Sequence, residues 1–561
     1  MTSSGLRVLI IGGYGTFGSR LARLLKDDPR FRLIIGGRSL EKARAFAAEL
    51  GGQAEGARFD RDAELMQQLT VLMPSVIVDA SGPFQAMGED RYRVAEAAIA
   101  LGISYLDLAD SRAFVAGIGA LDVAASQSGV FVLSGLSSFP ALSFAAAEVL
   151  AADFSEVTGV SAGIAPSPRA GIGLNVIKAI ASYAGKPVPV TKDGRVQDGV
   201  GLVDFRRMVI APPGAVPLRA RDFLLADAPD LALLPMRFPG LKTAFTGAGT
   251  EPRWLQSLLR LAARMVRFGL LPSLSPFAGL IHAASRRLAF GEHRGGMFVS
   301  VEGKGLDGGD YRADWNLIAE GDDGPFIPAT GAAALLRALA DGLRPASGAR
   351  PAIGEVPLSA FEAAFRPLAI RTGIRRHRAG DRDLPLYRRV LGDAWAALPP
   401  AVAAMHSVSG GEYRVSGRAR VERGKGLLAS IVATAIGFPK AAEDIPVSVT
   451  FTVEDGRETW VRDFGGRRFL SRQLEGTGRH AHLLAEEFGP VRVYIALVPE
   501  SGRMRLVIRG WQIFGVTLPL FLAPDGDTFE EERDGRFRFH VEIGSPLTGL
   551  IVRYTGWLMP D

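Results

Sequence analysis

The sequence predicts an α/β protein with three successive parts: a doubly wound parallel sheet, an α+β region, and an antiparallel β-rich region. Short apolar runs alternate with helix-like segments over residues 1–145, which is typical of a doubly wound sheet. Residues 146–370 mix helix-like segments with paired strand-like ones. Beyond residue 383, alternating strand-like segments are separated by turn pairs such as Asp455-Gly456 and Asp534-Gly535, which favours antiparallel strands in a barrel or a sandwich.

Composition limits the function classes that fit this chain. Its 561 residues are 47% hydrophobic and 22% charged, with a net charge of +6, so we expect about two to four globular domains. The arginines are spread along the chain and no basic block interleaves with aromatic residues, which argues against nucleic-acid binding. Cysteine is absent, which excludes disulfides, thiolate metal sites and a cysteine nucleophile. The sequence starts without a signal peptide pattern and contains no unbroken long apolar run, so we expect a cytoplasmic protein.

The first apolar run leads into a glycine turn. Val8 to Ile11 is short and β-branched, as in a strand buried on both faces, and leucines at helical spacing follow the turn. Gly13, Gly15 and Gly18 between them form the pattern G-x-G-x-x-G, in which the glycines allow a tight turn, the approach of a pyrophosphate, and close helix–strand packing. This context predicts dinucleotide binding, with a purely structural glycine turn as the alternative. The predicted cofactor loop is Gly12, Gly13, Tyr14, Gly15, Thr16, Phe17 and Gly18.

The end of the second strand predicts which dinucleotide binds. Leu33 to Ile35 is followed by Gly36-Gly37-Arg38-Ser39, about twenty residues past the glycine turn, where the ribose-binding residue is expected. A carboxylate there would favour NAD, but Arg38 and Ser39 instead offer donors for a 2′-phosphate. We therefore expect NADP, with NAD the less favoured cofactor. The alternative is that Arg38 stacks on adenine, which would serve both cofactors equally.

Polar residues follow the later strands of the first region, at the sheet edge where ligands bind. Asp60 ends the third strand, and it is a candidate either for the adenine amino group or for the N-cap of a helix from Ala63. Ser81, Gly82 and Pro83 follow the fourth strand. Asp107 and Asp110 end the fifth strand, and Ser137 and Ser138 follow the sixth. Among these side chains, Asp107 is slightly preferred as the catalytic proton donor.

Several of these segments resemble one known family. Gly-Gly-Tyr-Gly-Thr-Phe-Gly at 12–18, Ser-Gly-Pro-Phe at 81–84, Tyr-Leu-Asp at 105–107 and Gly-Leu-Ser-Ser-Phe-Pro at 135–140 resemble the saccharopine dehydrogenase-like oxidoreductases, most clearly over residues 1–145. The resemblance implies a Rossmann domain lined at the cofactor by Gly13, Gly15, Gly18, Arg38, Ser81, Gly82 and Pro83. It also implies an α+β domain that helps to form a substrate cleft and often a homodimer. Residues 398–400, 460–466 and 549–558 resemble an uncharacterised domain that is often fused behind this family.

Two features of the middle region bear on the substrate. Arg169 lies in a Pro- and Gly-rich loop and either pairs with a substrate carboxylate or has no specific partner. Residues 253–268 place Trp254, Leu258, Leu261 and Met265 at helical spacing, with Arg260, Arg264 and Arg267 on another face. Such a cationic amphipathic helix fits packing on the protein's own core, peripheral membrane contact through 253–284, or a dimer interface.

The predicted boundaries are a Rossmann domain at 1–145, an α+β substrate or dimerisation domain at 146–370, an arginine-rich linker at 371–383, and a β-rich domain at 384–561. Within the second of these, 326–370 is a candidate to pack back on the first domain. In the β-rich domain, Trp460, Arg462, Phe464 and Trp511 either line a ligand cavity or fill an ordinary core. His480 and His482 lack the further ligands of a metal site, so no metal is expected.

These observations together predict an oxidoreductase that uses NAD(P)H, with NADP preferred, on a small-molecule or lipid-like substrate. No cluster of arginines suited to an amino-acid conjugate with several carboxylates stands out in the sequence, which favours an apolar substrate. Two other functions stay open: a non-catalytic dinucleotide-binding regulator, and a lipid-binding protein built on an inherited Rossmann scaffold. We expect the protein to be cytoplasmic, and membrane-associated if residues 253–284 contact lipid.

Overall fold

The computed structural model describes residues 5–171, 173–287, 291–408 and 410–561. The chain divides into two compact units. Unit 1 comprises Met1–Met208 and Arg221–Thr372, and unit 2 comprises Val209–Ala220 and Gly373–Asp561. Each unit is described by itself.

A parallel sheet of seven strands forms the first part of unit 1, in the order β15-β6-β5-β4-β1-β2-β3. The order reverses at β1, as it does in doubly wound folds. The central strands carry apolar runs whose residues are buried, because helices cover both faces of a parallel sheet. The strands are β1 (Leu6–Ile11), β2 (Phe31–Gly37), β3 (Glu55–Arg58), β4 (Val76–Asp79), β5 (Ser104–Asp107), β6 (Phe131–Ser134) and β15 (Gly348–Pro351).

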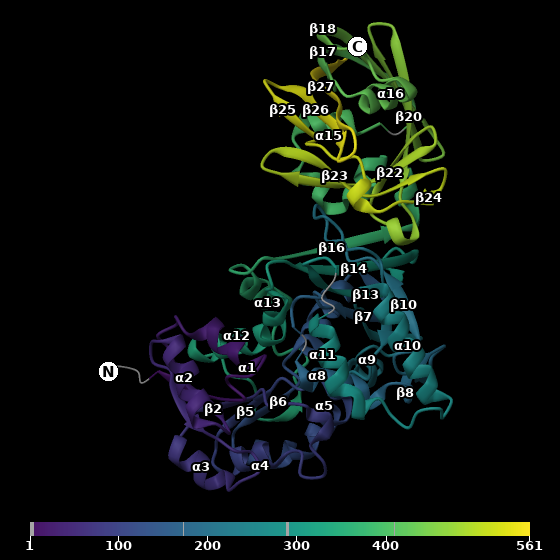
Figure 1. The fold of residues 1–561 in the computed structure, drawn as a ribbon. Helices are drawn as coiled ribbons and strands as arrows, with labels where there is room; N and C mark the ends of the chain where they lie inside the picture. Colours follow the sequence, from purple (N-terminus) through teal and green to yellow (C-terminus); the bar gives the residue numbers. More distant parts are fainter. Residues whose placement is uncertain (1–4, 172, 288–290, 409) are drawn as a thin grey trace. The chain divides into compact units, whose positions relative to one another are not determined.

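The helices of this part connect the strands and lie around the sheet in Figure 1. They are α1 (Gly18–Leu25), α2 (Leu40–Leu50), α3 (Leu65–Leu72), α4 (Arg93–Ala100), α5 (Arg112–Gly117), α6 (Asp122–Gln127) and α7 (Ser143–Ala151). Segments from much later in the chain join them. β15 pairs in parallel with β6, and α12 (Ile327–Ala340) packs against α1 and α13 (Leu358–Phe365). Residues 327–365 therefore complete this part of unit 1.

A mixed sheet forms the second part of unit 1, in the order β10-β11-β12-β7-β13-β14-β16, with β8 and β9 attached at β12. The predicted strand pair at 297–301 and 310–319 is observed as the antiparallel pair of β13 and β14. The strands are β7 (Phe154–Ala165), β8 (Pro187–Lys192), β9 (Arg195–Val200), β10 (Phe205–Met208), β11 (Arg221–Leu225), β12 (Thr243–Ala248), β13 (Gly295–Gly305), β14 (Asp310–Ala319) and β16 (Ile370–Arg378). The helices are α8 (Leu174–Tyr183), α9 (Asp230–Arg237), α10 (Arg253–Arg267) and α11 (Ala278–Arg287).

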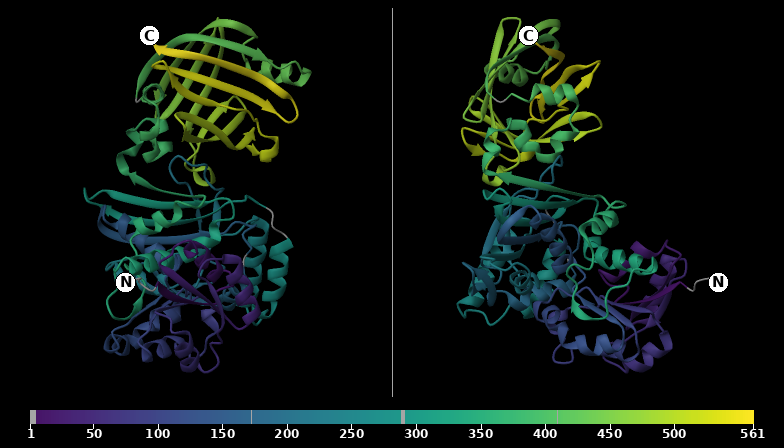
Figure 2. Two further views of the ribbon diagram at one scale, coloured as in Figure 1. Left: turned by 90° about the vertical axis from the view of Figure 1, so that its left-hand side faces the viewer. Right: turned by 180° about the vertical axis from the view of Figure 1, so that it is seen from behind.

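Unit 2 is built on an antiparallel sheet of eleven strands that runs from β22 through β17 and β27 to β23 and β24. β22 also pairs with β23 over ten residue pairs, so the sheet closes on itself as the barrel seen in Figure 2. The strands are β17 (Gly411–Arg423), β18 (Ala442–Glu454), β19 (Arg457–Phe464), β20 (Arg467–Glu475), β21 (Leu484–Phe488), β22 (Val491–Glu500), β23 (Arg503–Ile513), β24 (Val516–Thr517), β25 (Phe529–Arg533), β26 (Arg536–Ser545) and β27 (Gly549–Pro560).

Two short helices contribute to the interior of this barrel. α14 (Leu386–Leu391) and α15 (Pro400–Met405) bury apolar side chains in the same core cluster as the inward-facing residues of the strands. A third helix, α16 (Leu427–Ile436), connects β17 to β18 and packs against β27. The parallel sheet, the mixed sheet and the antiparallel barrel confirm the fold class that the sequence predicts.

The segment predicted as a linker has regular structure. Residues 371–383 lie in β16 and in the 3-10 helix η6 (Ala379–Asp383). Arg375 is buried there and donates hydrogen bonds to the carbonyls of Ala211 and Val390 within unit 2. The many arginines of this segment suggest solvent exposure, yet Arg375 is buried. Burial is possible because one guanidinium can donate hydrogen bonds to several backbone carbonyls at once.

Candidate functional site

The backbone of the glycine turn between β1 and α1 is packed tightly, as the sequence pattern predicts. Gly12 has a φ of +71°, which favours glycine. A Cβ on Gly18 would lie 2.9 Å from both the carbonyl carbon of Gly12 and the Cα of Gly13. A Cβ on Gly15 would meet only the Gly12 carbonyl, whose oxygen would lie 2.9 Å away and whose carbon 3.9 Å away. Gly18 thus sets the helix against the turn, while Gly15 leaves room above it for a pyrophosphate.

Phe17 caps α1 by its position but contributes no side-chain capping bond. Thr16 keeps its carbonyl bonded to the Arg20 guanidinium at 2.9 Å. The N–H groups of the first turn of a helix have no partners within the helix, and the helix dipole adds positive potential there. The loop from Gly12 to Gly18 therefore fits the diphosphate of a dinucleotide.

Tyr14 fixes the geometry next to the predicted ribose site. Its hydroxyl accepts a hydrogen bond from the Ser39 backbone N–H at 3.2 Å. A Cβ on Gly37 would overlap the Tyr14 ring, with the hydroxyl oxygen 2.8 Å away. Ser39 in turn caps α2 by accepting from the Lys42 N–H. The sequence did not reveal that Tyr14 ties the glycine turn to the end of β2.

Arg38 follows β2 directly and is exposed. Its side chain has no ion-pair or hydrogen-bond partner among the residues that the structure describes. Arg58 ends the neighbouring strand β3 opposite Gly37 and is exposed as well. The positive charge of Arg38 is therefore free to meet an anionic group at this edge of the sheet.

A polar cluster connects the ends of β3 and β4. Asp79 is fully buried, and its Oδ1 accepts from the Ser81 hydroxyl at 2.5 Å and from the Ser81 N–H at 2.9 Å. Arg61 donates to the Ser81 hydroxyl at 3.1 Å and lies 3.8 Å from the second Asp79 oxygen. Asp79 thereby holds the loop that contains Gly82 and Pro83. Neither Asp79 nor Arg61 was singled out from the sequence, because each is one polar residue without a local pattern.

Asp60 lies beside this cluster. Its carboxylate accepts from the Asp62 N–H at 3.2 Å, and α3 begins only at Leu65 with Glu64 as its N-cap. Of the two expectations for Asp60, the helix N-cap is therefore wrong, since the chain makes a separate turn before the helix. A contact between Asp60 and adenine stays a prediction.

The second part of unit 1 covers the glycine turn and the loop after β4. Asn175 at the start of α8 donates to the carbonyl of Gly82 at 2.6 Å. A Cβ on Gly173 would lie 3.0 Å from the Thr16 hydroxyl. The candidate cofactor loops are therefore bounded by the parallel sheet on one side and by α8 on the other. Arg169, in the loop before α8, is exposed.

Asp107, the preferred catalytic residue, is fully buried at the end of β5. Its Oδ1 accepts from the N–H of Gly135 at 2.7 Å, the N–H of Ala109 at 3.0 Å and the Ser134 hydroxyl at 3.0 Å. Burial raises the pKa of Asp107 to about 7 despite these donors. The bonds connect the loops after β5 and β6, so Asp107 organises the edge of the sheet. Its role as a proton donor stays a prediction.

A second polar group lies beyond Asp107. The Asp110 carboxylate accepts from Gln85 Nε2 at 3.0 Å, and Arg112 forms an ion pair with Asp227 at 2.6 Å. Burial, and then the charges of Asp110 and Asp227, raise the pKa of Tyr183 on α8. Asp110 is exposed at the surface, but desolvation of its carboxyl group by the surrounding protein raises its pKa as well. The phenol of Tyr183 therefore keeps its proton near two carboxylates, an arrangement that the sequence did not reveal.

Two stretches of this chain match known protein families. Residues 8–133 match the family described as the saccharopine dehydrogenase NADP binding domain. Residues 398–558 match a family described as a domain of unknown function, DUF4166. No curated protein matches the sequence of this chain. In the described part of the chain, no helix is long and apolar enough to cross a membrane.

Solved structures with similar folds have low sequence identity. Apo saccharopine dehydrogenase (L-Glu forming) from Saccharomyces cerevisiae is 13% identical, covers 66% of this chain and 100% of its own, and has a TM-score of 0.46. GenD2 from gentamicin A biosynthesis, in complex with NAD, is 17% identical over 56% of this chain and 73% of its own, with a TM-score of 0.28. A meso-dapdh mutant from Clostridium tetani E88 is 12% identical over 64% of this chain and 96% of its own, with a TM-score of 0.33.

At these TM-scores the solved structures do not indicate a substrate. The family match covers most of the parallel sheet and agrees with the glycine turn and with the exposed Arg38 after β2. It supports an oxidoreductase with a nicotinamide dinucleotide cofactor. Residues 8–133 thus resemble the NADP-binding domain of saccharopine dehydrogenases, and residues 398–558 resemble the DUF4166 domain.

Proposed function

We propose that this protein is an NADPH-dependent oxidoreductase that acts on an uncharged, apolar substrate. The observation that carries the cofactor assignment is the exposed and unpaired Arg38 directly after β2. A carboxylate at this place would accept from a ribose hydroxyl and repel a phosphate. A guanidinium without a partner instead favours the 2′-phosphate of NADPH.

Different residues of this chain bind the cofactor and donate the proton. The turn from Gly12 to Gly18 binds the diphosphate, Arg38 binds the 2′-phosphate, and the loop at Ser81 to Pro83, held by Asp79, bounds the pocket. The nicotinamide supplies a hydride when it is bound. Tyr183, whose pKa is raised by burial and by Asp110 and Asp227, holds a proton that it can donate to a substrate oxygen or nitrogen.

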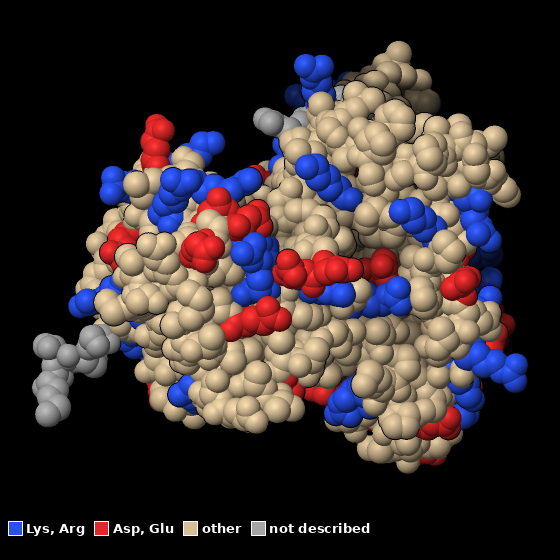
Figure 3. Space-filling view, turned by 90° about the horizontal axis from the view of Figure 1, so that it is seen from below, with Lys and Arg blue, Asp and Glu red and all other residues tan. Residues whose placement is uncertain are grey.

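The arginines of the second part of unit 1 argue against a substrate with several carboxylates. Several of those near the mixed sheet are already paired with acidic side chains: Arg207 with Asp222, Arg221 with Glu251, Arg294 with Glu292 and Arg312 with Asp314. On the face drawn in Figure 3, basic side chains are likewise interleaved with acidic ones. A polycarboxylate would have to displace these partners, which disfavours its binding.

The surface of α10 and α11 supports an apolar substrate that is met at a membrane. Trp254, Leu258 and Leu261 of α10 are 52–55% exposed. Phe268, Leu270, Phe277 and Leu280, which follow, are exposed too, as are Arg253, Arg264 and Arg267. Of the three expectations for this helix, packing on the protein's own core holds for one face only: Ala263 is buried in a core cluster with Ala262 and Val266 packed against it, whereas the face of Trp254 and Leu258 stays exposed. We propose that this apolar face with its arginines contacts anionic membrane surfaces.

The cofactor assignment is tested by titrating NADPH and NADH against the wild type and Arg38→Asp. A charge-assisted hydrogen bond contributes about 1.5–3 kcal/mol, so NADPH should bind on the order of ten- to a hundredfold more tightly than NADH to the wild type. Arg38→Asp should reverse this order. Arg32→Asp, which makes the same charge change at the exposed arginine within β2, should leave this order unchanged. Equal affinities in the wild type would contradict the assignment.

The membrane contact is tested by sedimentation with vesicles of anionic or neutral phospholipid at low salt. The wild type should sediment with the anionic vesicles only, and the double variant Trp254→Ser and Leu258→Ser should stay in solution. Val123→Ser, which removes an apolar side chain that is 70% exposed elsewhere in unit 1, should behave as the wild type. A wild type that stays in solution with both kinds of vesicle would refute the contact.

A further inference from the structure

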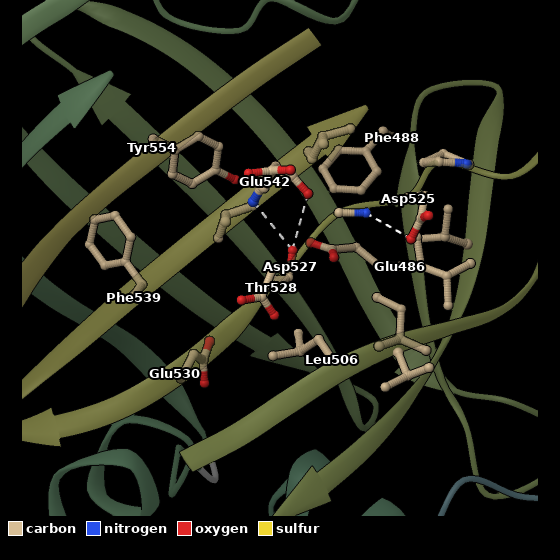
Figure 4. Close-up of a pocket in the computed structure, with 18 of the residues that line it drawn as sticks. Glu486, Phe488, Leu506, Asp525, Asp527, Thr528, Glu530, Phe539, Glu542 and Tyr554 are labelled. Carbon is tan, nitrogen blue, oxygen red and sulfur yellow. Dashed lines mark hydrogen bonds between the residues drawn. The ribbon is translucent and has the colours of Figure 1, made fainter. Parts of the chain in front are cut away.

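The barrel of unit 2 encloses a cavity of about 480 Å³. This volume lies within the range of about 300–1,000 Å³ that is usual for small-molecule sites. Its walls are mainly apolar side chains from the inward faces of the strands, and Figure 4 shows Leu506, Phe539 and Tyr554 around it. Trp460, Arg462 and Phe464 also line it. Trp511 is not one of the lining residues; its indole N–H donates to the Pro519 carbonyl at 2.9 Å.

The inward-facing side chains show that this space is not a filled core. Leu506, Ile508 and Val541 pack against the buried cluster of the barrel, yet each keeps part of its surface uncovered. All three line the cavity. Protein interiors are packed to the density of organic crystals, so apolar side chains that remain uncovered inside a closed barrel indicate room for an apolar molecule.

One side of the cavity carries a connected polar group. Arg462 donates to Glu486 at 3.1 Å and to Ser471 at 2.7 Å, and Ser471 donates to the same Glu486 oxygen at 2.7 Å. Gln473 bonds to Glu486 at 3.1 Å and accepts from the Tyr387 hydroxyl at 3.0 Å. The side chains of Arg462 and Glu486 are only 12% and 9% exposed. The charge of Arg462 is thus already balanced within the barrel wall.

The remaining polar groups of the lining are mostly acidic. Glu530 bonds to His406 at 2.6 Å, and Asp525, Asp527 and Glu542 line the cavity as well (Figure 4). Burial raises the pKa of Tyr554 to about 12, although Arg462 opposes this shift. Tyr554 therefore remains protonated and can donate or accept a hydrogen bond. A carboxylate ligand would meet acidic neighbours and two lining arginines, Arg462 and Arg505, that are already paired with glutamates. An uncharged polar group would meet no such repulsion.

The cavity reaches the surface beside apolar side chains. Phe521, one of the lining residues, is 74% exposed, and Leu547, next to the lining residue Pro546, is 69% exposed. Exposed apolar side chains at an entrance favour an apolar ligand over a sugar or a nucleotide.

We propose that the barrel binds an elongated apolar molecule with one uncharged hydrogen-bonding head group, of the fatty alcohol class. Its chain fills the space lined by Leu506, Ile508 and Val541. Its head group meets the polar side formed by Tyr554, Glu486 and Arg462. This site lies entirely within unit 2 and does not depend on the cofactor assignment for unit 1.

The experiment is a titration of the full-length protein with dodecanol and with dodecanoate, followed by native mass spectrometry and calorimetry. Dodecanol should bind at one site per chain, and dodecanoate at least tenfold more weakly. Leu506→Trp, which fills the cavity, should reduce dodecanol binding at least tenfold. Leu470→Trp makes the same change on β20 at a side chain that is 47% exposed, and it should bind as the wild type does. Tyr554→Phe should weaken dodecanol binding by about two- to tenfold.

Three results would overturn the proposal. The first is binding of dodecanoate as tight as that of dodecanol, which would contradict the charge argument. The second is that neither probe binds. The third is equal binding of dodecanol by Leu506→Trp and Leu470→Trp, which would place the ligand outside the barrel. An unchanged circular dichroism spectrum and a single cooperative unfolding of unit 2 on heating show that Leu506→Trp is folded. If that variant fails to fold, Ile508→Phe, a smaller filling of the same space, replaces it with the same expected loss.

Discussion

Replacing the glycines of the cofactor turn one at a time separates their two functions. A Cβ on Gly18 would lie 2.9 Å from the Gly12 carbonyl carbon and from Gly13 Cα, whereas non-bonded carbons prefer about 3.5–4.0 Å. Both neighbours are backbone atoms, so Gly18→Ala must move the start of α1 away from the turn by roughly 0.6–1 Å. Overpacking of this kind costs about 1–3 kcal/mol. We expect the melting temperature to fall by several degrees.

The same displacement should weaken the cofactor site. Hydrogen bonds to charged groups contribute about 1.5–3 kcal/mol and are lost when the donor moves by about an ångström. NADPH should therefore bind Gly18→Ala on the order of ten- to a hundredfold more weakly. Gly15→Ala differs in degree, because its Cβ would lie 2.9 Å from a single backbone atom, the Gly12 carbonyl oxygen, and otherwise points into open space. It should lower the melting temperature less than Gly18→Ala does but still bind NADPH about tenfold more weakly, since the Cβ occupies the approach of the pyrophosphate.

The assay is fluorescence titration of NADPH together with thermal unfolding of each variant. Gly119→Ala is the control, because a Cβ there would have no neighbour within 4 Å, and both measurements should match the wild type. The reasoning would be refuted if Gly18→Ala kept both the wild-type melting temperature and the wild-type affinity. It would also be refuted if Gly15→Ala bound NADPH normally.

Two further predictions concern buried titratable groups. Burial raises the pKa of Asp230 to about 7, so the folded state holds a proton that the unfolded state releases near pH 4, and stability falls by about 4 kcal/mol as pH rises from 4 to 7. Asp230→Asn mimics the protonated form and should melt several degrees above the wild type at pH 8 but close to it at pH 5; the same difference at both values would contradict the assignment. Tyr183→Phe should leave NADPH affinity unchanged and lower the rate of NADPH oxidation, measured with lipid extracts, by about a hundredfold or more; an unchanged rate would exclude Tyr183 as the proton donor.

The local features of the first sheet could be predicted from the sequence because each depends on neighbouring residues. Val8 to Ile11 reads as a buried strand, and the glycine spacing fixes the turn and the start of α1. β15, by contrast, comes from Gly348–Pro351 and joins β6 after an excursion of more than two hundred residues. Four residues that end in proline carry no periodic signal, so the partner strand of this segment could not be predicted.

The candidate site shows the same division. Arg38 was found because the fingerprint places a residue at a fixed spacing. Asn175, Arg61 and Tyr183 were missed because they act on the site from outside the glycine turn: α8 contributes Asn175 and Tyr183, and Arg61 follows β3. Side chains that meet only after folding leave no spacing to detect. The closure of the barrel through β22 and β23 is a tertiary feature of the same kind.

An apolar ligand is proposed for each of the two units, and each proposal rests on separate physical observations. In unit 1 it follows from the exposed face of Trp254, Leu258 and Leu261 and from arginines that are paired with acids. In unit 2 it follows from uncovered side chains inside a closed barrel, where an arginine is neutralised by Glu486. Vesicle binding tests the first and dodecanol binding tests the second, so either can fail alone. If both hold, one class of molecule, uncharged and long-chained, satisfies both units of the same chain.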